Sequence, residues 1–322
     1  MRLGALLMAA ACCLTLSTGV FAQAKPKITL GIVAKSQSNP VFQAAHQGAK
    51  DAAKELGDKY GVEVTINVQT PPEEDAQKQA QAVEQLASSG VAGIAVSCSN
   101  ANTLQPAIDK AVGGGVPVMC FDSDSPKSKR FAYYGTDDIA CGTKVGQELA
   151  KVMGDKGNVV ILAGNQAAPN LQNRAKGVKD ELAKHPGIKI IDTVYHEETP
   201  EKAAAAVQQE ASAHPEINGW AMIGGWPLFT HDALKFTPGS VKVVSVDALP
   251  PQLDYLRDGH VQLLLAQDCY GWGYKSVEIL LEKVVKGKAP ETAKVIDPLT
   301  PVTKDTVDEF GKKWDKWLGK SK

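Results

Sequence analysis

From residue 28 onwards, the sequence alternates short apolar runs with longer amphipathic segments, and this alternation limits most strongly how the chain can fold. Residues 28–34 form a continuous apolar run, as expected of a strand buried on both faces of a sheet. In residues 41–56, apolar side chains recur every three or four positions, which predicts a helix with one apolar face. Strands that alternate with helices of this length predict β-α-β units and parallel sheets.

The same pattern continues to the end of the chain. It predicts further strands at residues 62–68, 93–97, 116–121, 131–135, 158–163, 188–195, 219–223, 241–246 and 261–266. It predicts further helices at residues 74–88, 103–112, 139–153, 171–184, 200–213, 228–235, 251–258, 270–285 and 304–318. So many strands exceed one comfortable sheet. We therefore predict the α/β class, with two doubly wound parallel-sheet lobes.

The first 24 residues have the pattern of a secretion signal. Arg2 is their only charged residue, an apolar stretch follows, and Ala22-Gln23-Ala24 is a small-x-small cleavage site. We therefore expect an exported, periplasmic or otherwise extracytoplasmic protein. Cys12-Cys13 suggests a lipoprotein as an alternative, but Ala9 stands where a lipobox usually has a larger aliphatic residue. A lipid anchor is not favoured.

Composition excludes several classes of function. The chain has 35 Lys+Arg against 36 Asp+Glu and no basic run, which argues against a nucleic-acid partner. Once the leader is removed, the cysteines are Cys98, Cys120, Cys141 and Cys269, without C-x-x-C or zinc-type spacing, so we expect no metal and no cofactor. Cys98 and Cys120 lie near the ends of consecutive predicted strands, so a disulfide stays open, although buried free thiols are favoured.

Polar side chains gather after the predicted strands, where parallel sheets bind ligands. They include Lys35, Asn39, Asp122, Asp124, Glu198, Asp247 and Gln267, with Asn173 and Arg174 in the loop and helix after residue 163, and Phe42 and Trp226 as aromatic neighbours. A sugar hydroxyl both donates and accepts, so carboxylates, amides and an arginine can pair it fully. Flat aromatic rings suit the apolar face of a sugar. Acids outnumber bases here, which disfavours an anionic ligand.

Each of these residues has a structural alternative. Asp124 or Asp268 could cap a helix, and Asn39-Pro40 could be a turn with a proline-first helix start. Arg174 could be a solvated charge, and Phe42 and Trp226 could be ordinary core residues. Gly113-Gly114-Gly115 follows a predicted helix rather than a strand, so it is interpreted as a helix stop and not as a phosphate loop.

Taken in order, several segments resemble the type I periplasmic sugar-binding proteins of ABC transporters, the ribose-, arabinose- and galactose-binding group. These segments are residues 28–34, Ser38-Asn39-Pro40-Val41-Phe42, residues 115–122, residues 134–138, Asn173-Arg174 up to Gly177, residues 244–247 and residues 265–267. They follow the family's order over nearly the whole mature chain. Each is weakly specific alone, whereas their order and spacing together are specific.

The resemblance implies two lobes joined by three crossings that close on a ligand by a hinge motion. The crossings are expected near Asp137-Asp138, Gln267-Asp268 and residues 295–299. The expected domains are a signal peptide (1–24), an N-terminal lobe (25–136 plus 268–296) and a C-terminal lobe (137–267 plus 297–322). The implied partners are a sugar or polyol, the permease of an ABC importer and, as a further option, a chemoreceptor. We expect a monomer.

The resemblance and the strand-end pattern together give one ligand-binding set: Lys35, Asn39, Phe42, Asp122, Ser123, Asp124, Asn173, Arg174, Glu198, Gly225, Trp226, Asp247 and Gln267. The chain departs from the ribose type in that Ser123 and Asp124 follow Asp122 where an arginine is usual. The stretch His196-Glu197-Glu198 replaces an aromatic residue, and Gly225 with Trp226 replaces an asparagine. These differences predict a pocket of another shape, for a sugar or sugar alcohol other than ribose.

Other functions remain as alternatives. The same fold could bind a signal molecule or an anionic solute. An exported enzyme is disfavoured because the sequence has no nucleophile elbow, dinucleotide fingerprint or phosphate loop. A ligand-responsive repressor would need an N-terminal DNA-binding motif where this chain has its secretion signal.

Overall fold

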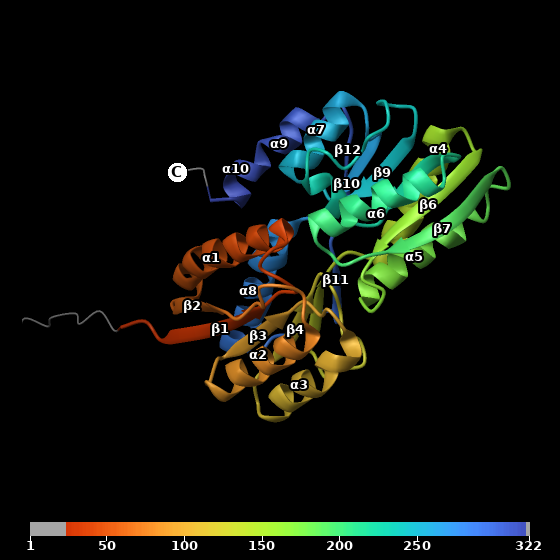
Figure 1. Cartoon of the computed structure of the whole chain (residues 1–322). Helices are drawn as coiled ribbons and strands as arrows, with labels where there is room; N and C mark the ends of the chain where they lie inside the picture. Colours follow the sequence, from red (N-terminus) through yellow and green to blue (C-terminus); the bar gives the residue numbers. More distant parts are fainter. Residues whose placement is uncertain (1–23, 320–322) are drawn as a thin grey trace, which may run out of the picture.

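The computed structural model describes residues 24–319, so the predicted signal peptide lies almost wholly outside the described residues. These residues form two α/β lobes, each built on a six-stranded sheet (Figure 1). The strand order is β11-β5-β4-β3-β1-β2 in the N-terminal lobe and β12-β10-β9-β8-β6-β7 in the C-terminal lobe. The two orders follow one pattern, so β1 corresponds to β6 and β4 to β9. The predicted fold class is confirmed.

The strands of the N-terminal lobe are β1 (Lys27–Val33), β2 (Glu63–Val68), β3 (Gly93–Val96), β4 (Val118–Phe121), β5 (Ala132–Gly135) and β11 (Lys294–Ile296). Those of the C-terminal lobe are β6 (Gly157–Gly164), β7 (Ile188–Tyr195), β8 (Ile217–Met222), β9 (Lys242–Val246), β10 (Leu263–Ala266) and β12 (Thr300–Val302). All neighbours pair in parallel except β10 and β12, which are antiparallel. The sequence did not predict β11 or β12, because each has only three residues.

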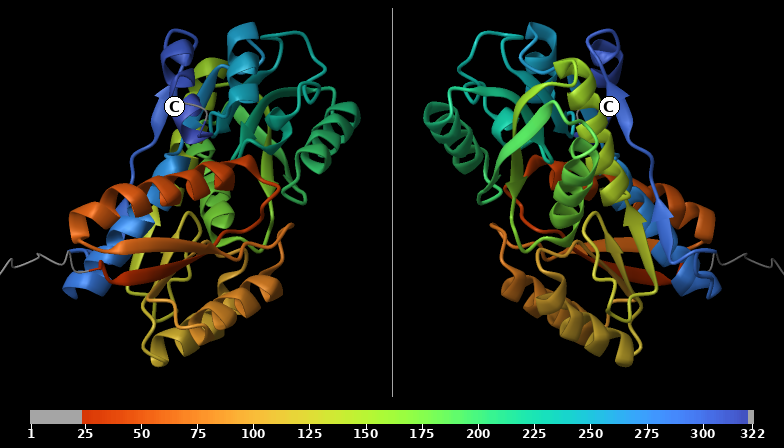
Figure 2. Two further views of the ribbon diagram at one scale, coloured as in Figure 1. Left: turned by 90° about the vertical axis from the view of Figure 1, so that its left-hand side faces the viewer. Right: turned by 90° about the vertical axis from the view of Figure 1, so that its right-hand side faces the viewer.

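The helices are α1 (Pro40–Tyr60), α2 (Ala76–Ser88), α3 (Ala101–Gly113), α4 (Asp138–Met153), α5 (Pro169–Leu182), α6 (Pro200–Ala213), α7 (Pro250–Asp258), α8 (Cys269–Lys286), α9 (Val307–Gly311) and α10 (Lys313–Trp317). In the N-terminal lobe, α1 and α8 cover one face of the sheet, and α2 and α3 cover the other (Figure 2). In the C-terminal lobe, α4 and α5 cover one face, with α6 and α7 on the opposite face. Every sheet is therefore buried on both sides, as the continuous apolar runs predict.

Two predicted helices are wrong in extent. The expected helix 228–235 is only a short 3-10 helix, Trp226–Phe229, because Thr230 takes an extended backbone that ends the turn. The expected helix 304–318 is divided into α9 and α10. Trp314 donates its indole N–H to the carbonyl of Ala248 (2.7 Å), and the ring of Trp317 stacks on Tyr270 of α8, with centroids 6.3 Å apart. The C-terminal segment therefore touches both lobes.

The chain passes between the lobes three times, after β5, after β10 and after β11. Each passage is short, since α4 begins at Asp138 after β5 ends at Gly135, and α8 begins at Cys269 after β10 ends at Ala266. The third passage joins Ile296 of β11 to Thr300 of β12. Three short connections of this kind can act as a hinge, so that the lobes rotate relative to each other while each keeps its own core.

Glycines let one pair of helices in each lobe pack at backbone distance. A Cβ at Gly273 of α8 would lie 1.7 Å from the carbonyl oxygen of Ala45 in α1. In the C-terminal lobe, a Cβ at Gly142 of α4 would lie 1.9 Å from the carbonyl oxygen of Arg174 in α5. These positions accept no side chain unless the helices move apart. The second contact fixes the backbone of Arg174, which matters for the site below.

We expect Gly142→Ala to destabilise the protein by about 1–3 kcal/mol, because the added methyl group forces α4 away from α5 in a packed core. The control is Gly113→Ala, where a Cβ meets nothing within 4 Å and the change should be neutral or slightly stabilising. Urea denaturation of both variants measures the difference. Equal stability of the two variants would contradict the close contact.

Candidate binding site between the lobes

Two aspartates end topologically equivalent strands and face the boundary between the lobes. Asp122 follows β4 and Asp247 follows β9, and both have left-handed backbone angles, with φ 55° and 69°. Non-glycine residues rarely adopt this region, although Asp tolerates it better than most. Such conformations tend to persist at functional sites, where the surrounding structure holds them. Here the sharp turn after each strand directs a carboxylate into the cleft.

A small cavity lies where these strand ends meet, and we call it the inner cavity. It has a volume of about 30 Å³, roughly that of one water molecule. The predicted residues that line it are Lys35, Asn39, Phe42, Asp122, Arg174, Glu198, Trp226, Asp247 and Gln267. The structure thus brings most of the predicted set together at one place between the lobes.

Gln267 lies at the second passage between the lobes and connects the polar groups around it. Its amide nitrogen donates to Asp247 Oδ1 (2.8 Å), and its amide oxygen accepts from Arg174 Nη2 (2.7 Å) and from Thr136 Oγ1 (3.0 Å). Arg174 is only 2% exposed and also donates to Asp138 Oδ1 (2.9 Å) and the carbonyl of Ile223 (3.2 Å). The guanidinium of Arg174 is therefore held by partners from three separate segments of the chain.

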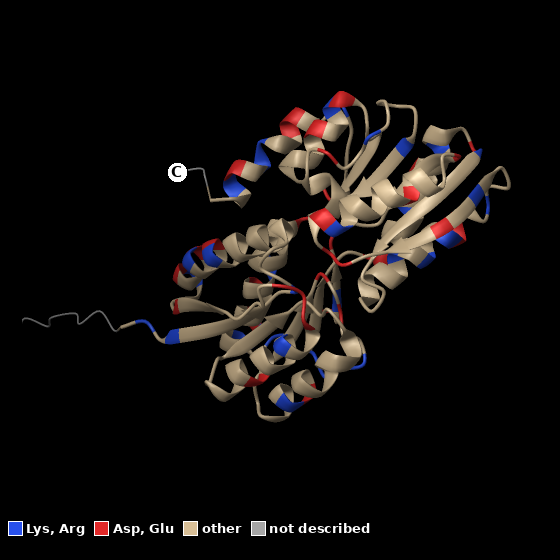
Figure 3. Ribbon diagram, viewed as in Figure 1, with Lys and Arg blue, Asp and Glu red and all other residues tan. Residues whose placement is uncertain are grey.

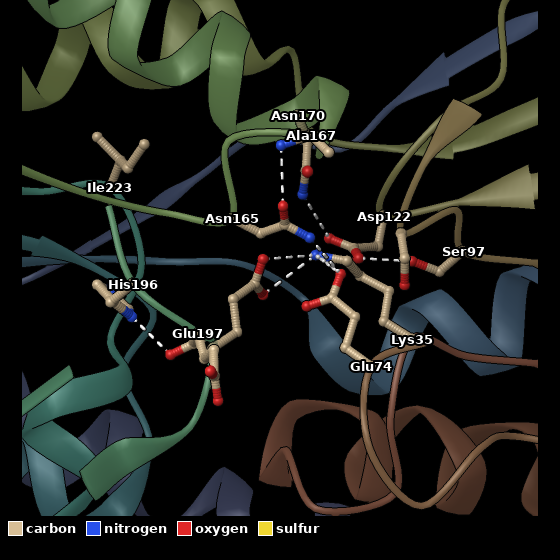
Figure 4. A network of polar contacts seen from close by, with 12 residues as sticks. Lys35, Glu74, Ser97, Asp122, Asn165, Ala167, Asn170, His196, Glu197 and Ile223 are labelled. Carbon is tan, nitrogen blue, oxygen red and sulfur yellow. Dashed lines mark hydrogen bonds and ion pairs between the residues drawn. The ribbon is translucent and has the colours of Figure 1, made fainter. Parts of the chain in front are cut away.

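Lys35 lies at the centre of a second polar group that spans the cleft (Figure 4). Its ammonium, in a residue only 2% exposed, donates to both carboxylate oxygens of Glu198 in the C-terminal lobe (3.0 and 3.1 Å) and lies 3.6 Å from Glu74 Oε1. Asn165 of the C-terminal lobe donates to Glu74 of the N-terminal lobe (3.1 Å). These contacts join the two lobes directly.

Burial and neighbouring charges shift the ionisation of these groups. Burial raises the pKa of Glu198 to about 7, although the Lys35 ammonium partly opposes this shift. Burial also raises the pKa of Asp138 to about 7, against the opposing effect of Arg174. Burial disfavours the charge of Lys35, but Glu198, Glu74 and Asp122 outweigh it and raise its pKa. Burial raises the pKa values of Asp122 and Asp247 as well.

Aromatic rings complete the walls of the inner cavity. Phe42, at the start of α1, packs against Trp272 of α8 with ring centroids 6.0 Å apart. Trp226 meets His196 edge-on at 5.0 Å, and its indole lies over Gly164 and Gly224, where a Cβ would come within 2.6 and 2.3 Å of the ring. The two glycines thus leave room for the indole beside the cavity.

Four predicted residues do not line the inner cavity. Asp124 forms an ion pair with Arg130, and Ser123 is buried but does not line the cavity. Asn173 is exposed and lines a separate hollow near the first passage between the lobes. Gly225 contributes its backbone N–H to Asp247 Oδ2 (3.3 Å), while Gly224 is the glycine that lines the cavity.

Five lining residues were not in the predicted set: Val41, Asn170, Leu171, Gly224 and Trp272. Asn170 is buried one turn before Arg174 on α5, and its side-chain nitrogen makes a long contact of 3.5 Å with Asp122 Oδ1 across the cleft. Its side-chain oxygen has no hydrogen-bond partner within residues 24–319. The i, i+4 spacing from Arg174 was the available signal, since it places both side chains on one helix face. Trp272 was interpreted only as part of a packing helix.

Three further findings on the described residues concern their cysteines, metal sites and membrane-spanning helices. Cys98 and Cys120 are free and buried, with their Sγ atoms 3.9 Å apart, so the favoured free-thiol interpretation describes them. No group of His, Cys, Asp and Glu among residues 24–319 has the arrangement of a metal site. Within the same residues, none of the helices has both the length and the apolar character needed to cross a bilayer.

The family model of the periplasmic binding protein domain matches residues 30–289, which include most of both lobes and every residue that lines the inner cavity. The chain belongs to this family. Among curated relatives, this periplasmic binding protein is 27% identical to a D-ribose/D-allose-binding protein of Pseudomonas aeruginosa, covering 88% of this chain and 91% of the relative. It is 28% identical to a xylitol-binding protein of Mycolicibacterium smegmatis, covering 73% and 67%.

A solved structure of similar fold is an ABC transporter solute-binding protein from Burkholderia graminis in complex with D-arabinose. It superposes with a TM-score of 0.80 at 29% identity, covering 88% of this periplasmic binding protein and 97% of that chain. A carbohydrate transporter solute-binding protein from Agrobacterium radiobacter, also in complex with D-arabinose, has a TM-score of 0.79 at 26% identity, with 89% and 98% covered.

The raised pKa of Glu198 predicts a pH dependence. A carboxyl group whose pKa rises from 4.5 to about 7 on folding binds its proton more tightly when folded, so it contributes stability at low pH that is lost as the pH rises through 7. We expect the stability of the wild type relative to Glu198→Gln to be greater at pH 5 than at pH 8, by at least about 1.4 kcal/mol, the value of one pKa unit. Urea denaturation at both pH values measures this. Parallel pH curves would contradict the raised pKa, and the opposite sign would mean that Lys35 dominates.

Proposed function

We propose that this chain is an extracytoplasmic solute-binding protein that captures a sugar or sugar alcohol between its lobes and delivers it to an ABC importer. The observation that carries the proposal is the convergence, at one point between the lobes, of Asp122, Asp247, Arg174, Asn39 and Gln267 beside aromatic rings. Carboxylates, amides and a guanidinium can pair every hydroxyl of a polyol. The rings of Phe42, Trp226 and Trp272 suit its apolar faces.

The charge balance favours an uncharged ligand. Lys35 and Arg174 are the cations of the inner cavity, and both already have carboxylate partners. An anion would therefore have to compete with Glu198 and Asp138 for them. Hydrogen bonds to charged groups contribute roughly 1.5–3 kcal/mol net, so a neutral polyol gains strong bonds without bringing a charge to be desolvated. The named ligands of the relatives, ribose, allose, xylitol and arabinose, are of this class.

Closure of the lobes is the proposed mechanism. Asp122 and Asn39 belong to one lobe, whereas Arg174 and Asp247 belong to the other, so a ligand that touches all four binds better when the lobes approach. The two lobes are proposed to divide at the passages after β5, β10 and β11. The closed form then presents surfaces of both lobes to the permease. A chemoreceptor as second partner, the signal peptide and the monomeric state stay predictions.

The ligand class can be tested by a thermal-shift screen of residues 25–322 with pentoses, hexoses, tetritols, pentitols, amino acids and sugar acids. We expect a rise in melting temperature with at least one neutral sugar or polyol, because a ligand that binds only the folded state stabilises it. Shifts only with amino acids or anions would assign the cleft to another ligand class. Asp122→Asn should remove the shift.

The position of the site is tested by two asparagines on one helix. We expect Asn170→Ala to weaken binding of the ligand found in the screen by about tenfold, since a buried amide facing Asp122 is lost. Asn173→Ala, three residues away and exposed, should leave the affinity unchanged. Isothermal titration calorimetry measures both. Weaker binding by Asn173→Ala would place the ligand in the hollow near the first passage, which both asparagines line, rather than in the inner cavity.

A further inference from the structure

A second and much larger cavity opens between the lobes next to the inner cavity, and we call it the outer chamber. Its volume is about 660 Å³, within the roughly 300–1,000 Å³ typical of small-molecule sites. Its walls come from both lobes: Ser36, Ser38 and Glu73 on one side, and Asn165, Tyr195 and Lys202 on the other. Because both lobes contribute, a molecule in this chamber would be enclosed by the same closure as one in the inner cavity.

The two cavities adjoin each other at one shared side chain. Glu198 lines both of them, and its carboxylate is held there by Lys35. Beside this pair, Asn165 reaches across the cleft to Glu74 (Figure 4). These long side chains can rotate without any change in the backbone. A ligand longer than one ring can therefore extend from the inner cavity into the outer chamber.

The chemistry of the outer chamber suits a second sugar ring. Tyr195, at the end of β7, keeps 44% of its surface exposed and is among the large apolar side chains that solvent reaches. An exposed aromatic ring in a chamber otherwise lined by hydroxyl, amide and carboxylate groups offers one flat apolar surface among hydrogen-bonding partners. This is the combination that already marks the inner cavity.

The charge of the chamber restricts which ring can bind. Glu73, Glu74, Glu197 and Glu198 line it, against Lys202 as its own exposed cation. Figure 3 shows acidic residues gathered where the lobes meet. A uronic acid in the chamber would face these carboxylates at short range. The chamber therefore favours a neutral second ring.

We infer that the outer chamber is a second sugar subsite, so that the cleft, once the lobes open far enough to admit a ring at the inner cavity, accepts a neutral disaccharide or glycoside with its second ring in the outer chamber. This inference rests on the proposed function, since it assumes a sugar in the inner cavity. Tyr195 is its specificity-determining residue, because its ring is the apolar surface on which the second sugar would stack.

The test compares matched pairs of sugars by calorimetry on residues 25–322: D-xylose with xylobiose, D-glucose with cellobiose, and D-galactose with lactose. We expect at least one disaccharide to bind as tightly as its monosaccharide or more tightly. Tyr195→Ala should weaken the disaccharide by about tenfold and leave the monosaccharide unchanged. The matched control is Val285→Ala, an exposed apolar side chain on α8 outside both cavities, which should change neither.

The outcomes separate the subsite from the proposed function. Binding of monosaccharides with rejection of all disaccharides would overturn the subsite and leave the proposed function standing. Disaccharide binding that Tyr195→Ala does not weaken would also overturn it, since the second ring would then lie elsewhere. If none of these sugars binds, the subsite fails, while the proposed function fails only if the tetritols and pentitols of the thermal-shift screen do not bind either. A uronic-acid form of the bound disaccharide should bind more weakly than the neutral one, and equal affinity would contradict the charge argument.

Discussion

The burial of two cations, Lys35 and Arg174, at the boundary between the lobes is the constraint on which the rest of the site depends. A buried charge is costly unless hydrogen-bonded partners surround it. Lys35 finds its partners across the cleft in Glu198 and Glu74, and Arg174 finds Asp138 and Gln267 near the passages. These requirements explain why so many acidic and amide side chains follow the strands.

The equivalence of the two sheets explains how one small region receives so many side chains. In each lobe, the carboxyl ends of the parallel strands lie at the same boundary. The equivalent strands β4 and β9 are each followed by an aspartate with left-handed backbone angles. The contact of Gly142 in α4 with the backbone of Arg174 in α5 then fixes how closely the two helices pack, and with it the position of the Arg174 backbone. The position of the site therefore depends on backbone packing as much as on the polar residues themselves.

The periodicity of the sequence predicted the alternation of strands and helices because burial on both faces demands it. It failed where local order depends on tertiary contacts. The three-residue strands β11 and β12 carry too little pattern, and Pro227 with Thr230 stops a helix that the apolar residues of 228–235 suggested. Within the site, the strand ends indicated Asp122 and Asp247. Asp124 pairs instead with Arg130, six residues later in the loop between β4 and β5, and the conformation of a loop has no strand or helix period from which it could be predicted.

The small volume of the inner cavity bears on how binding energy arises. Lys35 contacts Glu198 and Asn170 approaches Asp122 directly across the cleft, so the lobes already hold partners that a ligand would otherwise supply. A sugar that enters must replace these contacts with its own hydroxyl groups, and only the difference between the two sets favours binding. A charged ligand would add its own desolvation cost to this exchange, whereas a neutral polyol brings no charge into the cleft. The same side chains that close the cleft therefore also select the chemical class of what it encloses.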